Sequence, residues 1–361
     1  MRALKKVNLD FPLLFFLACL ISFGCFILYS ASDESQTVLV NQFIRIAIGL
    51  ICLIIVAQIP MRYWKILIPW LFIINVILLI LTLFFGAEGK GAERWLDLGV
   101  FRFQPSETIK VLLPILIAKI LSESGQSLKF SKVGIALVVI VLVGFLIVKQ
   151  PDLGTAILVS ASGIFVIFLS AIPWIYIIAF VTIVLLSLPV AWQFLLHDYQ
   201  KERVMIFLNP QIDSLGAGYH IIQSKIAIGS GGVDGKGWLN GTQSQLEFLP
   251  ERSTDFIFAV LSEEFGLNGV IILLAIYLFI ISRGLYIGTQ AQETFSRLIA
   301  GAIVLTFFVY LFVNMGMVTG LLPVVGLPLP LVSYGGTSMV TLLAGFGILM
   351  SVYTHRKLVS S

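Results

Sequence analysis

Long runs of apolar residues, separated by short polar segments, dominate this sequence. A helix that crosses the hydrocarbon core of a membrane needs about 20 consecutive, mostly apolar residues. Ten candidate runs occur, at residues 11–31, 39–59, 66–85, 106–121, 133–148, 155–171, 174–196, 256–282, 295–318 and 338–353. They do not alternate between apolar and polar residues, as the strands of a membrane β-barrel do. The sequence therefore predicts an all-α, polytopic integral membrane protein, built as a single membrane domain of about ten transmembrane helices.

The composition excludes the other broad classes of protein. Of the 361 residues, 58% are hydrophobic and 12% are charged, whereas soluble domains contain about 25% charged residues. A soluble globule and a disordered chain are both excluded. The first apolar run follows basic residues, as a signal peptide does, but it is too long for a cleaved signal and is predicted to be a retained helix. The three cysteines lie inside apolar runs, so buried thiols are expected rather than disulfides or a zinc site.

The distribution of Lys and Arg predicts the orientation in the membrane. With the N-terminus in the cytoplasm, the inner ends of the runs carry 12 of the 23 basic residues and three of the 19 acidic residues. The inner basic residues are Arg2, Lys5, Lys6, Arg62, Lys65, Lys119, Lys129, Lys132, Arg283, Arg297, Arg356 and Lys357. Because the number of runs is even, both termini are predicted to be cytoplasmic.

Two connections on the predicted outer side are too long to be turns. One covers residues 86–105 and the other residues 197–255. Long connections inside a compact fold are usually functional or disordered. Apolar residues such as Ile221 and Ile226 predict that part of the second connection packs against the helices. Its glycine-rich segment, 229–237, lacks the spacing of a phosphate-binding loop and is interpreted as a flexible loop.

Charged residues recur at the predicted outer ends of the apolar runs, where they are costly and usually functional. Arg45 lies in the second run, and Lys149 and Asp152 lie where the fifth and sixth runs meet. Glu107 and Lys110 are three residues apart, so their side chains share a helix face and can pair. Structural ion pairs explain any one of these residues. A polar cavity open to the outer side explains all of them together.

The densest polar cluster stands immediately before the eighth apolar run. Glu251 and Asp255 are four residues apart with Arg252 between them, and Asp255 lies at the predicted membrane boundary. One interpretation is that Asp255 caps the following helix, because acidic residues favour helix N-termini. The other interpretation is that Asp255 is a catalytic carboxylate. The spacing alone leaves both open.

A segment rich in glycine and proline joins the last two apolar runs. Such a segment at membrane depth is tolerated only where it lines protein or a wet cavity. Helix N-termini exposed there would favour anionic groups. The segment contains Gly320, Pro323, Gly326, Pro328, Pro330, Ser333, Gly335 and Gly336.

Several of these motifs together resemble the SEDS family (shape, elongation, division and sporulation). The C-terminal motif begins at Asn314 and continues through the glycine- and proline-rich segment to Ser338. The other motifs are Arg94-Trp95, Gln104-Pro-Ser-Glu107, Pro151-Asp-Leu-Gly-Thr155 and Phe248-Leu-Pro-Glu-x-x-Thr-Asp255-Phe. The resemblance covers the whole chain in order, and residues 241–251 look like the branch that acts in rod shape rather than in division. One departure is Ser253, where many relatives carry His.

The resemblance implies a peptidoglycan glycosyltransferase of the bacterial inner membrane with ten transmembrane helices. Such enzymes join lipid II, a disaccharide-pentapeptide on undecaprenyl pyrophosphate, into β-1,4-linked glycan strands during cell elongation. They work with a class B penicillin-binding protein, which is a transpeptidase, and with the elongation complex and its actin-like cytoskeleton. The active site is expected on the extracytoplasmic side. No nucleic acid partner is expected.

The resemblance also implies roles for individual residues. Asp255 matches the family's essential carboxylate and is expected to be the general base. Arg45 and Lys110 are expected to stabilise the pyrophosphate, with Glu107 orienting Lys110. The remaining candidates for substrate binding are Trp95, Asp152, Glu251, Arg252, Ser333, Gly335 and Gly336. A divalent cation such as Mg²⁺ or Mn²⁺ is expected to assist, with unknown ligands and without an organic cofactor.

Two alternatives belong to different functional classes. A lipid II flippase would also need charged residues inside the membrane, but it requires a polar path open in turn to both sides. A non-catalytic scaffold of the wall-synthesis complex needs contact surfaces but has no use for a carboxylate in a cavity. Because the charged residues cluster near the predicted outer ends, polymerisation is the favoured function.

Overall fold

Apolar helices make up most of the computed structural model of this chain. The structure describes residues 8–89, 92–97, 99, 102–123, 130–170, 173–195, 198–213, 216–246, 248–249 and 251–354. Among these residues, each of the ten apolar runs coincides largely with one helix. These helices are α1 (Phe11–Ala31), α2 (Gln36–Ala57), α3 (Met61–Phe85), α4 (Pro105–Ser122), α5 (Phe130–Val148), α6 (Leu153–Leu169), α7 (Trp174–Val190), α11 (Ile257–Thr289), α12 (Thr294–Val318) and α13 (Thr337–Thr354).

Seven of the described helices are long and apolar enough to cross a membrane by length and composition alone: α1, α2, α3, α5, α11, α12 and α13. Helix α6 and the regular part of α7 are apolar but shorter. Helix α4 carries Glu107, Lys110 and Lys119 within 18 residues. The chain is therefore a multi-pass membrane protein, and the crossing of the membrane by all ten helices stays a prediction.

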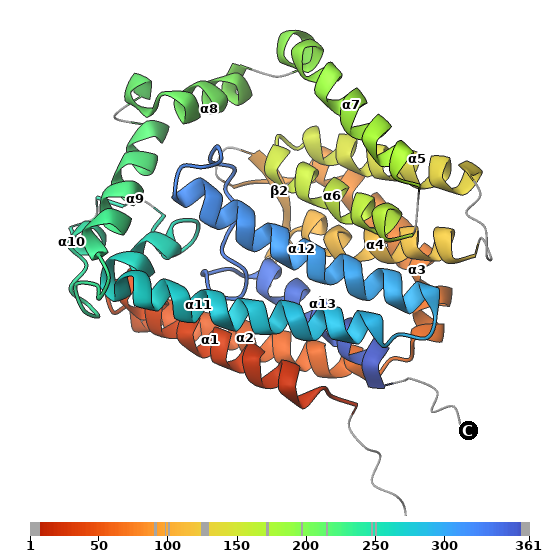
Figure 1. Cartoon of the computed structure of the whole chain (residues 1–361), viewed down its shortest axis with the longest axis horizontal. Coiled ribbons are helices and arrows are strands. Elements are labelled where there is room, and N and C mark those ends of the chain that lie inside the picture. Colours follow the sequence, from red (N-terminus) through yellow and green to blue (C-terminus); the bar gives the residue numbers. More distant parts are fainter. Residues whose placement is uncertain are drawn as a thin grey trace, which may run out of the picture.

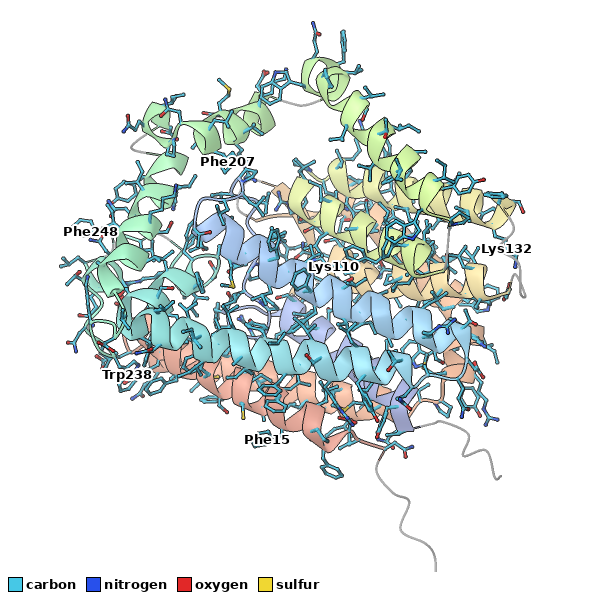
Figure 2. The ribbon with its side chains drawn as sticks, viewed as in Figure 1. Phe15, Lys110, Lys132, Phe207, Trp238 and Phe248 are labelled. Carbon is cyan, nitrogen blue, oxygen red and sulfur yellow. The ribbon has the colours of Figure 1, made fainter. Side chains whose placement is uncertain are left out.

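Helix α12 lies at the centre of the bundle and packs against α4, α6, α11 and α13 (Figure 1). Helix α13 also packs along α2, and α1 packs along α11. The outer helices turn large apolar side chains away from the bundle, as Phe15 does with 62% of its surface exposed (Figure 2). Apolar exposure of this kind suits contact with lipid tails rather than with water.

Ion pairs join the helices at the end of the bundle that carries Asp10 and the start of α1. Asp10 accepts a hydrogen bond from the backbone of Leu13 at 2.9 Å, which caps α1. Its carboxylate also pairs with Arg283 of α11 at 2.6 Å. Lys65 of α3 pairs with Glu293 at 2.8 Å. This is the end at which the charge distribution predicts the cytoplasm; Arg2, Lys5, Lys6, Lys129, Arg356 and Lys357 lie outside the described residues.

The connection between α3 and α4 contains a small antiparallel sheet that the all-α prediction did not include. Strand β2 (Ala92–Asp97) pairs with β1 (Ala87–Gly89) and with β3 (Arg102–Phe103). Apolar periodicity does not reveal such short strands, because each is too short to show a pattern.

The connection between α7 and α11 contains several short helices rather than one open loop. After a π-helical turn, η1 (Ala191–Leu195), come α8 (Asp198–Leu208), the 3₁₀ turn η2 (Pro210–Asp213), α9 (Ala217–Gly231) and α10 (Thr242–Gln245). Helix α9 packs on α11, with Ile221 buried and Ile226 exposed. In Figure 1, α9 and α10 lie at one end of the bundle beside the start of α11, and α8 extends above the bundle between α9 and α7. His197, the predicted start of this connection, lies outside the described residues.

The glycine-rich segment after α9 packs against a break in α11. Gly266 has a φ of 59°, outside the helical range, and it divides α11. A Cβ atom on Gly235 would lie 2.1 Å from the carbonyl oxygen of Glu264. Here the glycines allow two backbones to touch, which is a structural role different from the predicted flexible loop.

Candidate active site

Asp255 lies in a turn formed by residues 251–256, immediately before α11, and its side chain is half-buried. Three consecutive backbone carbonyls of this turn accept hydrogen bonds from elsewhere in the chain. The Ser253 carbonyl accepts from the backbone N–H of Tyr334 at 2.9 Å, and the Thr254 carbonyl accepts from the Ser333 hydroxyl at 2.5 Å. The Asp255 carbonyl accepts from the Asn314 side chain at 2.9 Å. The position of the catalytic candidate is thus fixed through its main chain.

The partners of this turn come from α12 and from the Gly/Pro loop, residues 319–336. Asn314 is fully buried and donates a second hydrogen bond, at 2.7 Å, to the carbonyl of Leu327. Ser333 accepts from the backbone N–H of Leu329 at 2.7 Å while it donates to the turn. The predicted irregular backbone is therefore present between α12 and α13, and it packs against the Asp255 turn.

Gly326 brings the Gly/Pro loop close to the Asp255 carboxylate. Its φ of 73° lies in the left-handed region that favours glycine. A Cβ atom built there would lie 3.5 Å from Oδ2 of Asp255. The carboxylate therefore has a backbone wall on one side and retains an exposed part, as a base that meets a substrate hydroxyl requires.

Arg252 and Glu251 form hydrogen bonds within the turn and to neighbouring segments. Arg252 donates to the Ser244 carbonyl and forms an ion pair with Asp33, in the connection between α1 and α2. Glu251 accepts from the Thr254 hydroxyl at 2.6 Å. Both side chains thereby stabilise the turn and its neighbours.

Arg45 lies beside the N-terminus of α13, next to the two glycines that the sequence singled out. Its guanidinium lies over the ring of Tyr334, 4.2 Å from the centroid. A Cβ atom on Gly336 would lie 3.7 Å from Nε of Arg45. Gly335 precedes it in the chain. A guanidinium next to a helix N-terminus forms a positive region that favours an anion.

Glu107 and Lys110 form the ion pair that their spacing predicts, with Nζ of Lys110 2.6 Å from Oε1 of Glu107. Their side chains are only 10% and 5% exposed, respectively. The pair lines a small cavity between α4, α12 and α13. Figure 2 shows Lys110 well inside the bundle. Tyr310 of α12 lines the same cavity, with the ammonium 5.0 Å from its ring centroid.

Tyr310 also lines a second, smaller cavity, whose other wall is formed by residues 328–333 of the Gly/Pro loop. Ser333, which bonds to the Asp255 turn, lies on the wall of this cavity, as do Ser338 and Leu342. Tyr310 and Leu342 are the residues that the two cavities share. The first cavity is lined by the ion pair, and the second is lined by Ser333, which bonds to the Asp255 turn. Tyr310 and Leu342 form the wall between these two cavities.

Asp152 has a structural position at the start of α6. Its carboxylate accepts from the backbone N–H of Thr155 at 3.2 Å and lies 3.6 Å from the guanidinium of Arg94. The next residue but one, Gly154, touches the Gly/Pro loop, because its Cβ would lie 2.8 Å from the carbonyl oxygen of Val325. Asp152 therefore stabilises an element that supports the loop. Trp95, on β2, is half-buried and follows Arg94, which lies beside Asp152.

A buried pair of glutamates in α11 was not singled out from the sequence. Glu263 is fully buried, pairs with Lys236 at 2.6 Å and accepts from the backbone N–H of Gln243 at 2.9 Å. Glu264 accepts a hydrogen bond from the Ser30 hydroxyl of α1. These contacts fasten the segment after α9 to α1 and α11. Two adjacent acidic residues inside an apolar run are a signal that could have revealed them.

His220 lies next to the turn, with its ring stacked on Phe256 at a centroid distance of 5.7 Å. Burial lowers the pKa of His220 below its usual value. Burial at this position thus disfavours the charged form of the imidazole next to the turn.

No three His, Cys, Asp or Glu side chains converge on a common point among the described residues. A resident divalent cation normally binds several such ligands. Among the residues that the structure describes, no such ligand cluster is present.

The comparisons with known proteins agree along the whole chain. Residues 11–358 match the family FtsW/RodA/SpoVE, described as "Cell cycle protein". The chain is 54% identical to the peptidoglycan glycosyltransferase MrdB of Escherichia coli K12, covering 98% of this chain and 96% of that protein. It is 32% identical to the peptidoglycan glycosyltransferase RodA of Treponema pallidum, covering 98% and 99%.

Solved structures share the fold. One, described as "Structural coordination of polymerization and crosslinking by a peptidoglycan synthase complex", matches with a TM-score of 0.84 and 30% identity over 96% of this chain and 97% of that chain. The crystal structure of RodA from Thermus thermophilus matches with a TM-score of 0.74 and 26% identity over 98% and 100%. With a family match over nearly its whole length, and a relative at 54% identity, the chain belongs to the FtsW/RodA/SpoVE family, the SEDS proteins.

Proposed function

We infer that the chain is a peptidoglycan glycosyltransferase, and we propose that it joins lipid II into β-1,4 glycan strands with Asp255 as general base. The enzyme class follows from the family and from relatives that carry this activity in their names. The observation that supports the role of Asp255 is the set of three hydrogen bonds to carbonyls 253–255, which holds the backbone of this half-buried residue beside the Gly/Pro loop.

The proposed step is a direct displacement at the anomeric carbon of one lipid-linked sugar. Asp255 takes the proton from the 4-hydroxyl of the other sugar while that oxygen forms the new glycosidic bond. The bond to the pyrophosphate breaks, and its electron pair leaves with the undecaprenyl pyrophosphate. Displacement from the opposite side inverts an α-linked donor to a β-linked product. A positioned base contributes about 10²–10⁴-fold to such a rate.

We assign to Arg45 and Lys110 the role of stabilising the negative charge that develops on the leaving pyrophosphate. Arg45 provides a fixed guanidinium at the N-terminus of α13, and Glu107 orients the ammonium of Lys110. Donors aimed at developing charge in a water-poor site stabilise the transition state strongly. A divalent cation such as Mg²⁺ or Mn²⁺ would enter with the pyrophosphate, as part of the substrate.

The setting of the reaction is part of the proposal. We place both termini in the cytoplasm of a bacterium with the Asp255 turn outside, because basic residues concentrate at the other end of the bundle. The solved complex that coordinates polymerisation and crosslinking supports a class B penicillin-binding protein as the partner. We also propose action within the elongation complex and its actin-like cytoskeleton, a proposal that the rod-shape name of one structural relative supports.

The flippase and the scaffold remain the competing functions. A flippase requires a polar path through the bundle, whereas most of the residues that line the cavity beside the Glu107–Lys110 pair are apolar. A scaffold function does not explain why the Asp255 carboxylate is held at a fixed position. Both therefore account for less of the site than polymerisation does.

The deciding experiment is the substitution Asp255→Asn, assayed with purified protein and lipid II. The amide keeps the size of the side chain and one acceptor but cannot take the proton, so glycan synthesis should fall by about 10²–10⁴-fold. The same protein should fold and still bind its transpeptidase. Glu251→Gln, four residues away in the same turn, is the matched control and should cost much less.

Polymer formation by Asp255→Asn at the wild-type rate would show that Asp255 is not the base. Failure of the wild-type protein to make polymer, with the transpeptidase present and its own chemistry blocked, would instead favour a flippase or a scaffold.

A further inference from the structure

Tyr310 contacts both charges of the buried ion pair from the opposite helix. It is 2% exposed, the ammonium of Lys110 lies 5.0 Å from its ring centroid, and its phenol group interacts electrostatically with both Glu107 and Lys110. It is also shared by the cavity that holds the ion pair and the cavity below the Gly/Pro loop. An apolar side chain would be enough to separate the two cavities. The hydroxyl of Tyr310 therefore needs another explanation.

The position of Tyr310 on α12 connects the ion pair with the Asp255 turn. Thr306, Tyr310 and Asn314 follow one another at four-residue intervals and so lie along one face of the helix. Asn314, one turn away, bonds directly to the carbonyl of Asp255. Helix α12 therefore contacts the backbone of Asp255 through Asn314 and the Lys110 ammonium through Tyr310.

A lysine ammonium is a compact charge with three donors on a flexible stem, and one acceptor does not fix its direction. Glu107 takes one of the three donors of Lys110 at 2.6 Å. A second polar group on the opposite wall would keep the ammonium from turning wholly toward that carboxylate. The remaining donor would then face the second cavity, where the Gly/Pro loop and Ser333 lie.

We propose that Tyr310 is a positioning residue, whose hydroxyl directs the Lys110 ammonium toward the leaving pyrophosphate. This inference rests on the proposed function. It predicts a role in the transition state rather than in substrate binding, because the ammonium is needed most where negative charge develops.

The test compares variants of the full-length protein in lipid II polymerisation, with kcat and KM measured separately and folding checked by thermal unfolding. Tyr310→Phe keeps the ring and the wall between the cavities, so the protein should fold. We expect kcat to fall by about 10–100-fold, with KM within about twofold of wild type. Thr306→Val is the matched control, since Thr306 lines the first cavity, and should keep kcat within about twofold.

A second pair of variants separates hydrogen bonding from packing. Tyr310→Gln and Tyr310→Leu both remove the ring, but only the glutamine restores a polar group near the ammonium. We expect kcat of Tyr310→Gln to exceed that of Tyr310→Leu by about tenfold, because one positioned hydrogen bond to a charged group is worth about 1.5 kcal/mol or more.

Three results would overturn the inference: Tyr310→Phe with the kcat of wild type, equal losses in Tyr310→Phe and Thr306→Val, or equal kcat in the glutamine and leucine variants. A loss of thermal stability with unchanged kcat per folded molecule would assign Tyr310 to packing alone. Wild-type protein that makes no polymer would reject the proposed function itself, and so is distinguishable from these results.

Discussion

Glu107 and Lys110 carry opposite charges in a part of the bundle where neither has much access to water. Removing one partner of a buried pair leaves the other uncompensated, at a cost of about 3–5 kcal/mol. We therefore expect Lys110→Met to lower the unfolding temperature strongly. The double variant Glu107→Gln with Lys110→Met should recover most of that stability and remain a poor polymerase, because the cation is still missing. Thermal unfolding in detergent and lipid II turnover measure the two effects; recovery of both together would mean that the pair is only structural.

At the scale of single residues, the sequence predicts contacts that depend on local spacing. The Glu107–Lys110 pair follows from the three-residue interval, and the structure confirms it. The ion pair of Arg252 with Asp33 joins residues 219 positions apart, which no local pattern reveals. Tyr310 was missed for another reason, since an aromatic residue in an apolar run is usually part of the core.

Among the helices, α11 depends on its break at Gly266. A Cβ atom there would lie 2.4 Å from the backbone nitrogen of Gly235 and 2.5 Å from the carbonyl oxygen of Val233, and the φ of 59° is unfavourable for alanine. We expect Gly266→Ala to cost more than the 1–3 kcal/mol or so that such a backbone conformation alone costs. Hydrogen exchange in residues 232–246 should rise with it, since this segment packs on the break.

The matched control for Gly266 is Gly229→Ala, within α9. A Cβ atom on Gly229 meets no atom within 4 Å. Alanine inside a helix is favoured over glycine, so this variant should be neutral or more stable by about 0.5–1 kcal/mol. Equal stability of the two alanine variants would show that the break in α11 does not depend on Gly266.

The helices were largely predictable as elements because each apolar run is long. The first run coincides with α1 at both ends, 11–31, while α11 reaches Thr289, beyond the predicted end at 282. The predicted end marks where the apolar run stops, but a helix can continue through polar residues beyond the membrane. Helix α11 therefore extends past Arg283. The sheet and the contacts of the Gly/Pro loop were not predictable, because they depend on tertiary packing between distant segments.

At the scale of the whole molecule, we predict how a divalent cation takes part in the reaction. Among the described residues, no three His, Cys, Asp or Glu side chains lie close enough together to hold one. If Mg²⁺ enters on the pyrophosphate, chelation with EDTA should stop polymerisation while the unfolding temperature of the substrate-free protein stays the same. Anything that binds only the folded protein raises its stability in proportion to binding. Titration of the free protein with Mg²⁺ should therefore cause no rise. A clear rise in unfolding temperature at micromolar Mg²⁺ would point to a resident site instead.

The hydrogen bonds to residues 253–255 use main-chain oxygens, which every amino acid provides. The side chain at position 253 therefore takes no part in these three hydrogen bonds, which hold the backbone of Asp255. A change of the side chain at position 253 should therefore leave all three main-chain hydrogen bonds of the turn in place.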